Sequence, residues 1–298
     1  MTAETRFTLE SVAKRKNVKP TPFRDRNGEN PFNASGVVRT GSRCFTFVDN
    51  KDPTALFEMT FDADLDTVER IRRRHLLGAG DLGDPEGLTR IDHDGETLLV
   101  VASSLSVERN RVNDGLVRVR YRPDGDLPAE PMAGFRAWLL GHVPALAAPG
   151  RRKPDDDGLN VEGLAFDAGT SALLFGLRGP AVTGQVTLIH VPVDLTGEWT
   201  TDSLGAPTVR SARIPRSAAA QGIRDLDCDG DLLVLLGRSA SHDDAPFRLG
   251  TWPRGGDTVR LLDITFHRTA KPEGVTAFSA GGERKILVVD DNGGYAVL

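Results

Sequence analysis

Short apolar runs recur along the whole chain, and turn-forming residues separate them. Many of these runs alternate between apolar and polar positions, and Gly, Asp, Asn or Pro bounds them, which predicts β-strands joined by tight turns. One segment instead has residues at helical spacing (Phe135, Trp138, Leu139 and His142) and predicts a short helical insertion near residues 132–148. The pattern therefore predicts an all-β protein with one short helical insertion.

One kind of six-residue segment, which we term an opening segment, begins a strand at five places. About ten residues after each opening segment comes a second apolar run. A two-strand unit that recurs at intervals of roughly 50 to 75 residues is typical of a β-propeller. The opening segments are Asn33-Ala-Ser-Gly-Val-Val, Asp84-Pro-Glu-Gly-Leu-Thr, Asn160-Val-Glu-Gly-Leu-Ala, Gly222-Ile-Arg-Asp-Leu-Asp and Lys271-Pro-Glu-Gly-Val-Thr.

The remaining apolar runs complete a single domain over residues 1–298, with the architecture of a five-bladed β-propeller. Blade five lacks an outermost strand, and the alternating N-terminal segment Arg6–Val12 is predicted to supply it and to close the ring. The predicted strands are one that starts at Ser35, followed by 44–48, 55–61 and 68–77, in blade one; 87–91, 97–102 and 116–121 in blade two; 163–166, 172–177, 186–193 and 209–214 in blade three; 225–228, 232–236, 247–252 and 259–266 in blade four; and 274–278, 285–289 and 295–298 in blade five.

The third residues of the opening segments carry the candidate chemistry. If these segments form the innermost strands, their side chains meet around the axis of the ring. Three desolvated carboxylates at one point repel each other, and a hard cation with oxygen ligands would relieve the repulsion. Calcium suits such a ring better than magnesium, and no histidine or cysteine spacing favours zinc. The third residues, and hence the predicted metal ligands, are Ser35, Glu86, Glu162 and Glu273, with Arg224 in the fourth segment.

Two features of the opening segments leave alternatives open. A glycine follows the third residue in four segments, where crowded innermost strands need close backbone approach, and Asp225 takes its place in the fourth. Glu-Gly also initiates strands at tight turns without any metal. Arg224 either points inward and neutralises part of the charge, or points outward while Asp225 supplies an acid.

Antiparallel order within a blade places the entering turns of first strands beside the loops that leave second strands. Charged and amide residues of these loops are therefore expected at the same end of the ring as the carboxylates, whereas the other end has ordinary turn residues. Arginine and lysine there would hold an anion, and a carboxylate without a metal would act as general base. Surface charge or salt bridging between blades explains Arg178 and Arg238 equally well. The candidate catalytic residues are Arg178, Arg224, Asp84 and Asp291, and the candidate substrate-binding residues are Arg178, Arg238, Lys271, Asn160 and Asn50.

The order of motifs over residues 30–298 resembles a bacterial propeller family known only as a domain of unknown function. The motifs are Asn160-Val-Glu-Gly-Leu-Ala, Gly176-Leu-Arg-Gly-Pro, Gly222-Ile-Arg-Asp-Leu and Lys271-Pro-Glu-Gly-Val. That family resembles the phytase-like propellers in its Glu-Gly strand openings.

The axial order Ser, Glu, Glu, Arg, Glu is similar to the Ser, Glu, Glu, Ser, Glu ring of the five-bladed calcium-activated nucleotidases (apyrases). This resemblance implies one axial calcium ion, with phosphoanhydride hydrolysis above it. Ser35, Glu86, Glu162 and Glu273 match its ligand positions, Arg224 departs from the pattern, and the nucleotidases' further motifs are missing.

Three functions follow as hypotheses. The first is an enzyme dependent on a metal, Ca²⁺ or alternatively Mg²⁺, that acts on a small anionic substrate, a phosphate ester or anhydride. The second is a lactonase or lyase that uses the same pocket. The third is a non-catalytic binding scaffold in which a structural cation plugs the axis, since no phosphate loop or nucleophile motif is present.

Composition narrows the partners. The net charge of −5 gives no basic field for nucleic acid, and no apolar run is long enough to span a membrane. We therefore expect a cytoplasmic protein that binds a small anionic molecule, needs no organic cofactor and functions without nucleic acid or membrane; a monomer is compatible with this pattern. The two cysteines, Cys44 and Cys228, give no disulfide framework and predict buried free thiols.

Overall fold

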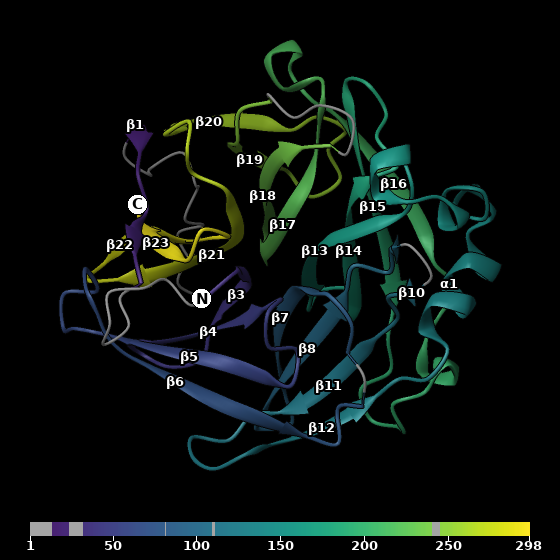
Figure 1. Cartoon of the computed structure of the whole chain (residues 1–298), viewed down its shortest axis with the longest axis horizontal. Coiled ribbons are helices and arrows are strands. Elements are labelled where there is room, and N and C mark those ends of the chain that lie inside the picture. The colour runs from purple at the N-terminus through teal and green to yellow at the C-terminus, as the bar shows by residue number, and fades with distance from the viewer. Residues whose placement is uncertain (1–13, 24–31, 81, 109–110, 240–244) are drawn as a thin grey trace, which may run out of the picture.

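Antiparallel sheets of three or four strands surround a central axis in the computed structural model, as in a β-propeller (Figure 1). The structure describes residues 14–23, 32–80, 82–108, 111–239 and 245–298. The first two sheets begin at the axis and continue outward. Their strands are β3 (Ala34–Arg39), β4 (Cys44–Asp49), β5 (Ala55–Phe61) and β6 (Val68–Leu77), then β7 (Pro85–His93), β8 (Glu96–Ser103), β11 (Leu116–Arg120) and β12 (Leu127–Pro131).

The other three sheets have the same order from the axis outward. A small hairpin of β9 (Val107–Glu108) and β10 (Arg111–Val112) extends from the second sheet. The strands of the remaining sheets are β13 (Asn160–Asp167), β14 (Ala172–Gly179), β15 (Gln185–Pro192) and β16 (Thr208–Arg213); β17 (Gln221–Asp229), β18 (Asp231–Arg238), β19 (Arg248–Trp252) and β20 (Arg260–Phe266); and β21 (Pro272–Ala280), β22 (Glu283–Asp290) and β23 (Gly294–Val297).

The innermost strands form a closed ring. Strand β3 packs beside β7, β7 beside β13, β13 beside β17, β17 beside β21, and β21 beside β3, and Figure 1 shows these strands around the centre. They are buried along most of their length, whereas the outer strand β6 is mostly exposed or half-buried. Burial on both faces explains why the inner strands appear in the sequence as short, nearly continuous apolar runs.

Outer strands join neighbouring sheets. Strand β6 pairs in parallel with β12, Leu76 opposite Leu127, and so unites the first two sheets. At the N-terminal side, β1 (Arg15–Val18) adds to β20 in parallel and β2 (Thr21–Pro22) pairs antiparallel with β23. The segment predicted to close the ring, Arg6–Val12, lies outside the described residues, and the strand found beside β23 is the later segment β2.

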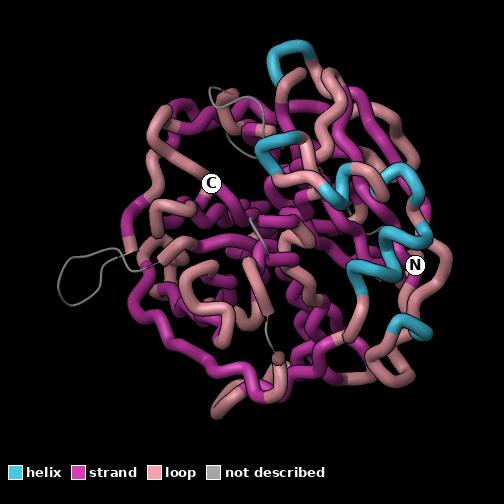
Figure 2. Tube along the Cα trace, turned by 45° about the vertical axis from the view of Figure 1, so that its right-hand side comes forward, coloured by secondary structure: helices cyan, strands magenta, loops and turns pink. Residues whose placement is uncertain are grey.

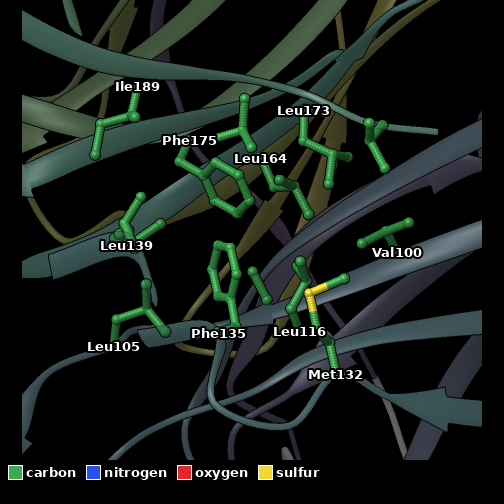
Figure 3. Close-up of a cluster of buried hydrophobic side chains, with 14 of the residues drawn as sticks. Val100, Leu105, Leu116, Met132, Phe135, Leu139, Leu164, Leu173, Phe175 and Ile189 are labelled. Atoms are coloured by element: carbon green, nitrogen blue, oxygen red, sulfur yellow. The ribbon is translucent and has the colours of Figure 1, made fainter. Parts of the chain in front are cut away.

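The predicted helical insertion is confirmed as α1 (Phe135–His142). Phe135 and Leu139 are buried between the second and third sheets, with the Phe135 ring 5.2 Å from the ring of Phe175 on β14 (Figure 3). The helical segments gather on one side of the molecule (Figure 2). Besides α1 they are the 3-10 helices Pro144–Leu146, Pro149–Arg151, Pro154–Asp156, Thr201–Ser203 and Arg216–Ala218.

Both cysteines are free, as predicted, but each is only half-buried rather than fully enclosed. Within the described residues, no helix is both long and apolar enough to cross a membrane.

Candidate functional site

The opening segments place their third side chains together at one end of the axis, which we term the opening end. Ser35, Glu86, Glu162, Arg224 and Glu273 come from five different innermost strands, and all five are buried. Contacts between these side chains link the strands across the ring. These residues meet around the axis in the structure, as the sequence predicted.

Glycines allow this convergence. A Cβ atom on Gly87 would lie 2.6 Å from the Cβ atom of Leu164, and one on Gly36 would lie 2.7 Å from the carbonyl oxygen of Glu86. Both distances are shorter than real Cβ contacts. Gly36 also has φ +35°, in a region that side chains disfavour. The glycines of the first two opening segments therefore leave room for the neighbouring innermost strand.

Arg224 points inward and bridges two of the glutamates. Its Nε lies 2.7 Å from Glu162 Oε2, and its Nη2 donates to Glu273 Oε1. Burial of the guanidinium acts to lower the Arg224 pKa, but Glu162 and Glu273 outweigh it, so the pKa is raised. The Ser35 hydroxyl donates to the other oxygen of Glu273 at 3.3 Å. Arg224 is thus a permanent cation within the carboxylate ring.

Asp225, the residue that replaces glycine in the fourth segment, points away from this ring. Its Oδ2 accepts a hydrogen bond of 2.6 Å from the Val275 backbone amide on the neighbouring strand. The sequence left open whether Arg224 or Asp225 faces the axis. In the structure Arg224 faces the axis, and Asp225 joins β17 to β21.

The calcium site stays a prediction. The axial residues, as they are arranged in the structure, do not form the calcium site that the nucleotidase resemblance implies. Among the residues that the structure describes, no group of three or more His, Cys, Asp or Glu side chains is arranged to hold a metal. Two of the predicted ligands, Glu162 and Glu273, already share the Arg224 cation. A calcium ion on the axis would have to displace this side chain.

Glu162 has a second cation, Arg178. The Arg178 Nη1 donates to Glu162 Oε1 at 2.9 Å, and its Nε donates to the Arg238 carbonyl oxygen at 3.2 Å. Asn160 Nδ2 donates to the same Glu162 oxygen at 3.1 Å. Arg178 and Asn160 are therefore brought to the axial cluster, whereas Arg238 contributes its backbone to these contacts.

Glu86 differs from the other two glutamates because its direct contacts are not with a cation. Asn50 Nδ2 donates to its Oε1 at 2.9 Å, and its carboxyl group interacts with that of Asp84. The pKa of Glu86 is raised well above its usual value by burial, then by the charges of Glu162 and Asp84. Burial also raises the pKa of Asp84. Two neighbouring carboxyl groups therefore both resist ionisation.

Polar residues of the second sheet surround Asp84. Its backbone has φ +52°, and its side chain interacts with Ser104 and accepts a hydrogen bond of 3.4 Å from Asn113 Nδ2. Asn113 also donates to Ser106 at 3.0 Å. The sequence analysis missed Asn113 because it follows the β9–β10 hairpin, where no motif distinguishes it from a loop residue.

Glu273 titrates close to neutrality. Burial raises its pKa to about 7, although the charge of Arg224 acts in the opposite direction. Lys271 and Asp291 lie farther out, with Lys271 Nζ 3.5 Å from Asp291 Oδ2 and the lysine side chain about half-exposed. These two residues pair at the rim of the site and not with the axial carboxylates.

Two of the asparagines have an unused acceptor. The Oδ1 atoms of Asn50 and Asn160 are buried and have no hydrogen-bond partner among the described residues. A buried amide oxygen without a partner is costly, and a bound donor such as a hydroxyl group or a water would satisfy it. Both atoms belong to side chains that also contact the axial glutamates.

Solved structures of similar fold support the propeller-like architecture. The major allergen Mala s 1 of Malassezia sympodialis is 8% identical, with a TM-score of 0.50 and 88% of each chain covered. The exo-beta-1,3-galactanase 1,3Gal43A of Clostridium thermocellum is 11% identical, with a TM-score of 0.51, and the match covers 93% of this chain and 61% of the galactanase. At these identities the likeness concerns the fold alone.

Sequence comparison gives the family. No curated protein matches the chain. A family model described as "Protein of unknown function (DUF3616)" matches residues 144–296, just over half of the chain, including three of the five opening segments. The chain therefore belongs to the DUF3616 family.

Proposed function

We propose that the chain is an acid–base enzyme, a hydrolase of a small anionic ester or lactone, with its site at the opening end of a five-bladed propeller. The observation that carries this proposal is the contact between the Asp84 and Glu86 carboxyl groups, both with raised pKa, beside a network of fixed cations. Perturbed carboxyl pairs in a cluster of convergent polar groups are typical of catalytic sites. The cyclic packing of β3, β7, β13, β17 and β21 supports five blades.

The two carboxyl groups have different environments, which suits them to different roles. Glu86 is the more deeply buried and has the more strongly raised pKa, so we assign it the role of general acid. Asp84 is only half-buried and acts as the general base. It removes a proton from water, the water oxygen attacks the carbonyl carbon, and the carbon–oxygen bond to the leaving group breaks. Glu86 donates its proton to the leaving oxygen.

The neighbouring side chains would position the substrate. Arg178 is held by Glu162 and by the Arg238 carbonyl oxygen, and about a quarter of its side chain remains exposed (24%), so its guanidinium is available to a carboxylate or phosphate. The unpartnered Oδ1 atoms of Asn50 and Asn160 would accept from hydroxyl groups of the substrate. Arg224 holds Glu162 and Glu273 in position.

Turnover of a panel of carboxylated chromogenic esters, lactones and phosphate esters tests the proposal. We expect activity in the wild-type chain, with Asp84→Asn and Glu86→Gln each reducing kcat by about 10²- to 10⁴-fold. Asp257→Asn, an exposed acid paired with Arg213, is the matched control and should keep full activity. Undiminished turnover in Asp84→Asn, or no turnover of any panel member by the wild type, would contradict the assignment.

A non-catalytic scaffold is the second candidate, because the Arg224 ion pairs could plug the axis in place of a cation.

A metal-dependent phosphate hydrolase, as the nucleotidase resemblance implies, is distinguished by thermal melting with EDTA and then calcium. We expect no shift for the wild type and a calcium-dependent rise in Tm for Arg224→Ser, which frees the ring for the ion. An EDTA-sensitive wild type would instead support the metal-dependent enzyme.

A further inference from the structure

A cavity lies at the other end of the axis, which we term the far end. It has a volume of about 270 Å³, and all five innermost strands contribute to its wall. Its lining residues other than Asp92 occur three or four positions after the axial residues of the opening end, for example Phe166 after Glu162 and Cys228 after Arg224. At about 3.3 Å per strand residue, the cavity is about 10 to 13 Å from the axial cluster.

Arg39 is held rigidly in the wall of this cavity. Its Nε donates to the Gly41 carbonyl oxygen at 3.0 Å, its Nη1 to Ser279 at 3.0 Å and its Nη2 to Ser42 at 2.6 Å. The guanidinium also packs 5.4 Å from the ring centroid of Phe278. These acceptors are carbonyl groups and not carboxylates, so they leave the Arg39 charge uncompensated. Within the described part of the chain, three of its five N–H groups have acceptors, and two are left for a ligand.

Arg90 is the second cation of the cavity. Its Nε and Nη2 donate to Asp92 Oδ1 at 3.0 and 2.8 Å, and its Nη1 donates to the Arg39 carbonyl oxygen at 2.9 Å. Burial, together with the charge of Arg90, lowers the Arg39 pKa, which indicates that the two guanidinium groups repel each other. An anion between them would relieve this repulsion.

The other acid in the wall, Asp227, does not neutralise them. Its Oδ2 accepts from the Ala277 amide at 2.6 Å and from the Thr276 hydroxyl at 3.3 Å. Its Oδ1 accepts from the Cys228 amide at 2.9 Å. The carboxylate is therefore engaged with β21 and with its own backbone, and its hydrogen bonds are not with Arg39 or Arg90.

We propose that the far-end cavity is a second binding site, which holds the carboxylate or phosphate group of a small ligand between Arg39 and Arg90. Planar guanidinium groups with two N–H donors each to spare match the geometry of such oxyanions. Phe166 lines the same cavity and gives a surface for an apolar part of the ligand. The site is separate from the opening end, so it stands whether or not the proposed hydrolase activity is found.

Calorimetric titration of the full chain with inorganic phosphate, and separately with malonate, tests the site and distinguishes the two kinds of ligand. We expect saturable binding of at least one anion, at one per chain. Arg39→Gln and Arg90→Gln should each weaken it at least about tenfold, because each removes one of the charge-assisted contacts. Arg213→Gln, an exposed arginine on another strand, should bind as the wild type does. Saturable binding of neither anion, or unchanged affinity in Arg90→Gln, would overturn the proposal.

Protection of Cys228 locates the bound anion without a variant and covers the case in which Arg39→Gln does not fold. Cys228 lines the cavity, whereas Cys44 does not, so Cys44 serves as an internal reference. Burial raises the pKa of Cys228 to about 12, so its alkylation is slow and is followed over a long time course by mass spectrometry. The saturating anion should slow the alkylation of Cys228 relative to that of Cys44. Equal rates with and without it would place the anion elsewhere.

Discussion

At the opening end of the axis, Arg224 is buried between Glu162 and Glu273. At the far end, Arg39 lines a cavity and donates to carbonyl groups, beside Arg90, which pairs with Asp92. Both ends use residues of the same innermost strands. The difference lies in what satisfies the charges. The opening end pairs them inside the protein, and the far end leaves donors for a molecule from outside.

One fold therefore contains charges that are paired inside the protein and charges that face a cavity. Glycines at the opening end let the strands approach until side chains of different strands contact directly. At the far end, larger side chains such as Phe166 and Arg39 stand around a cavity of about 270 Å³. A charge that is paired inside the protein contributes to stability, so its removal should lower the free energy of unfolding. A charge that faces a cavity should affect binding more than stability.

The largest expected effect on stability comes from Arg224→Met. This variant leaves Glu162 and Glu273 buried without their shared cation, and we expect the free energy of unfolding to fall by about 3 to 5 kcal/mol. The exposed Arg213, paired with Asp257, is the control, and Arg213→Met should cost less than about 1 kcal/mol. Urea denaturation measures both. An Arg224→Met chain as stable as the Arg213→Met chain would remove the basis of the comparison.

The pH dependence of stability should reveal the same pairing. An acid whose pKa is higher in the folded chain than in the unfolded chain stabilises the fold at low pH, and this contribution is lost as the pH rises through the folded pKa. Glu273 has a folded pKa of about 7, against an ordinary value of 4.5. Between about pH 5.5 and about pH 8 we therefore expect the free energy of unfolding to decrease by about 2 kcal/mol from Glu273.

Glu273→Gln distinguishes this source from other titrations, because glutamine does not ionise. The slope of stability against pH should become flatter in that variant, and the exposed Glu283→Gln should keep the wild-type slope. Glu86, whose pKa is also raised, contributes in the same direction. Stability that increases from about pH 5.5 to about pH 8 would show that the carboxyl groups at this end are not buried as described.

The sequence predicted the strands and the convergence of the opening segments because both depend on local patterns. Inner strands buried on two faces give apolar runs, and glycine after the third residue marks a close approach that only a missing side chain allows. The outer strand β12 was missed because its sequence Leu-Pro-Ala-Glu-Pro contains two prolines, which indicate a loop. It lies between β6 and β11 and pairs with each over only part of its length.

The direction of Arg224 and the far-end cavity could not be predicted, because both depend on residues from distant strands. Arg224 points inward since Glu162 and Glu273 stand on either side of it, and Asp225 finds a donor in Val275 on another strand. The sequence interpretation gave the far end only ordinary turn residues. The cavity there is formed by side chains from five strands, whose combined shape no single turn reveals.

The smallest expected effect is that of salt on the Arg224 contribution to stability, and it sharpens the comparison most directly. Salt screens exposed charges strongly, with a Debye length of about 10 Å at 0.1 M, but it screens buried pairs much less. The Arg224 side chain is 6% exposed, whereas that of Arg90 is 33% exposed. Between about 0.05 M and about 0.5 M NaCl, the stability difference between the wild type and Arg224→Met should change by less than about 0.5 kcal/mol. Over the same range the affinity for malonate should fall several-fold, because screening and chloride competition act on Arg39 and Arg90. If the two quantities decreased in parallel, Arg224 would be accessible to solvent ions, and the two ends of the axis would not differ in how they hold charge.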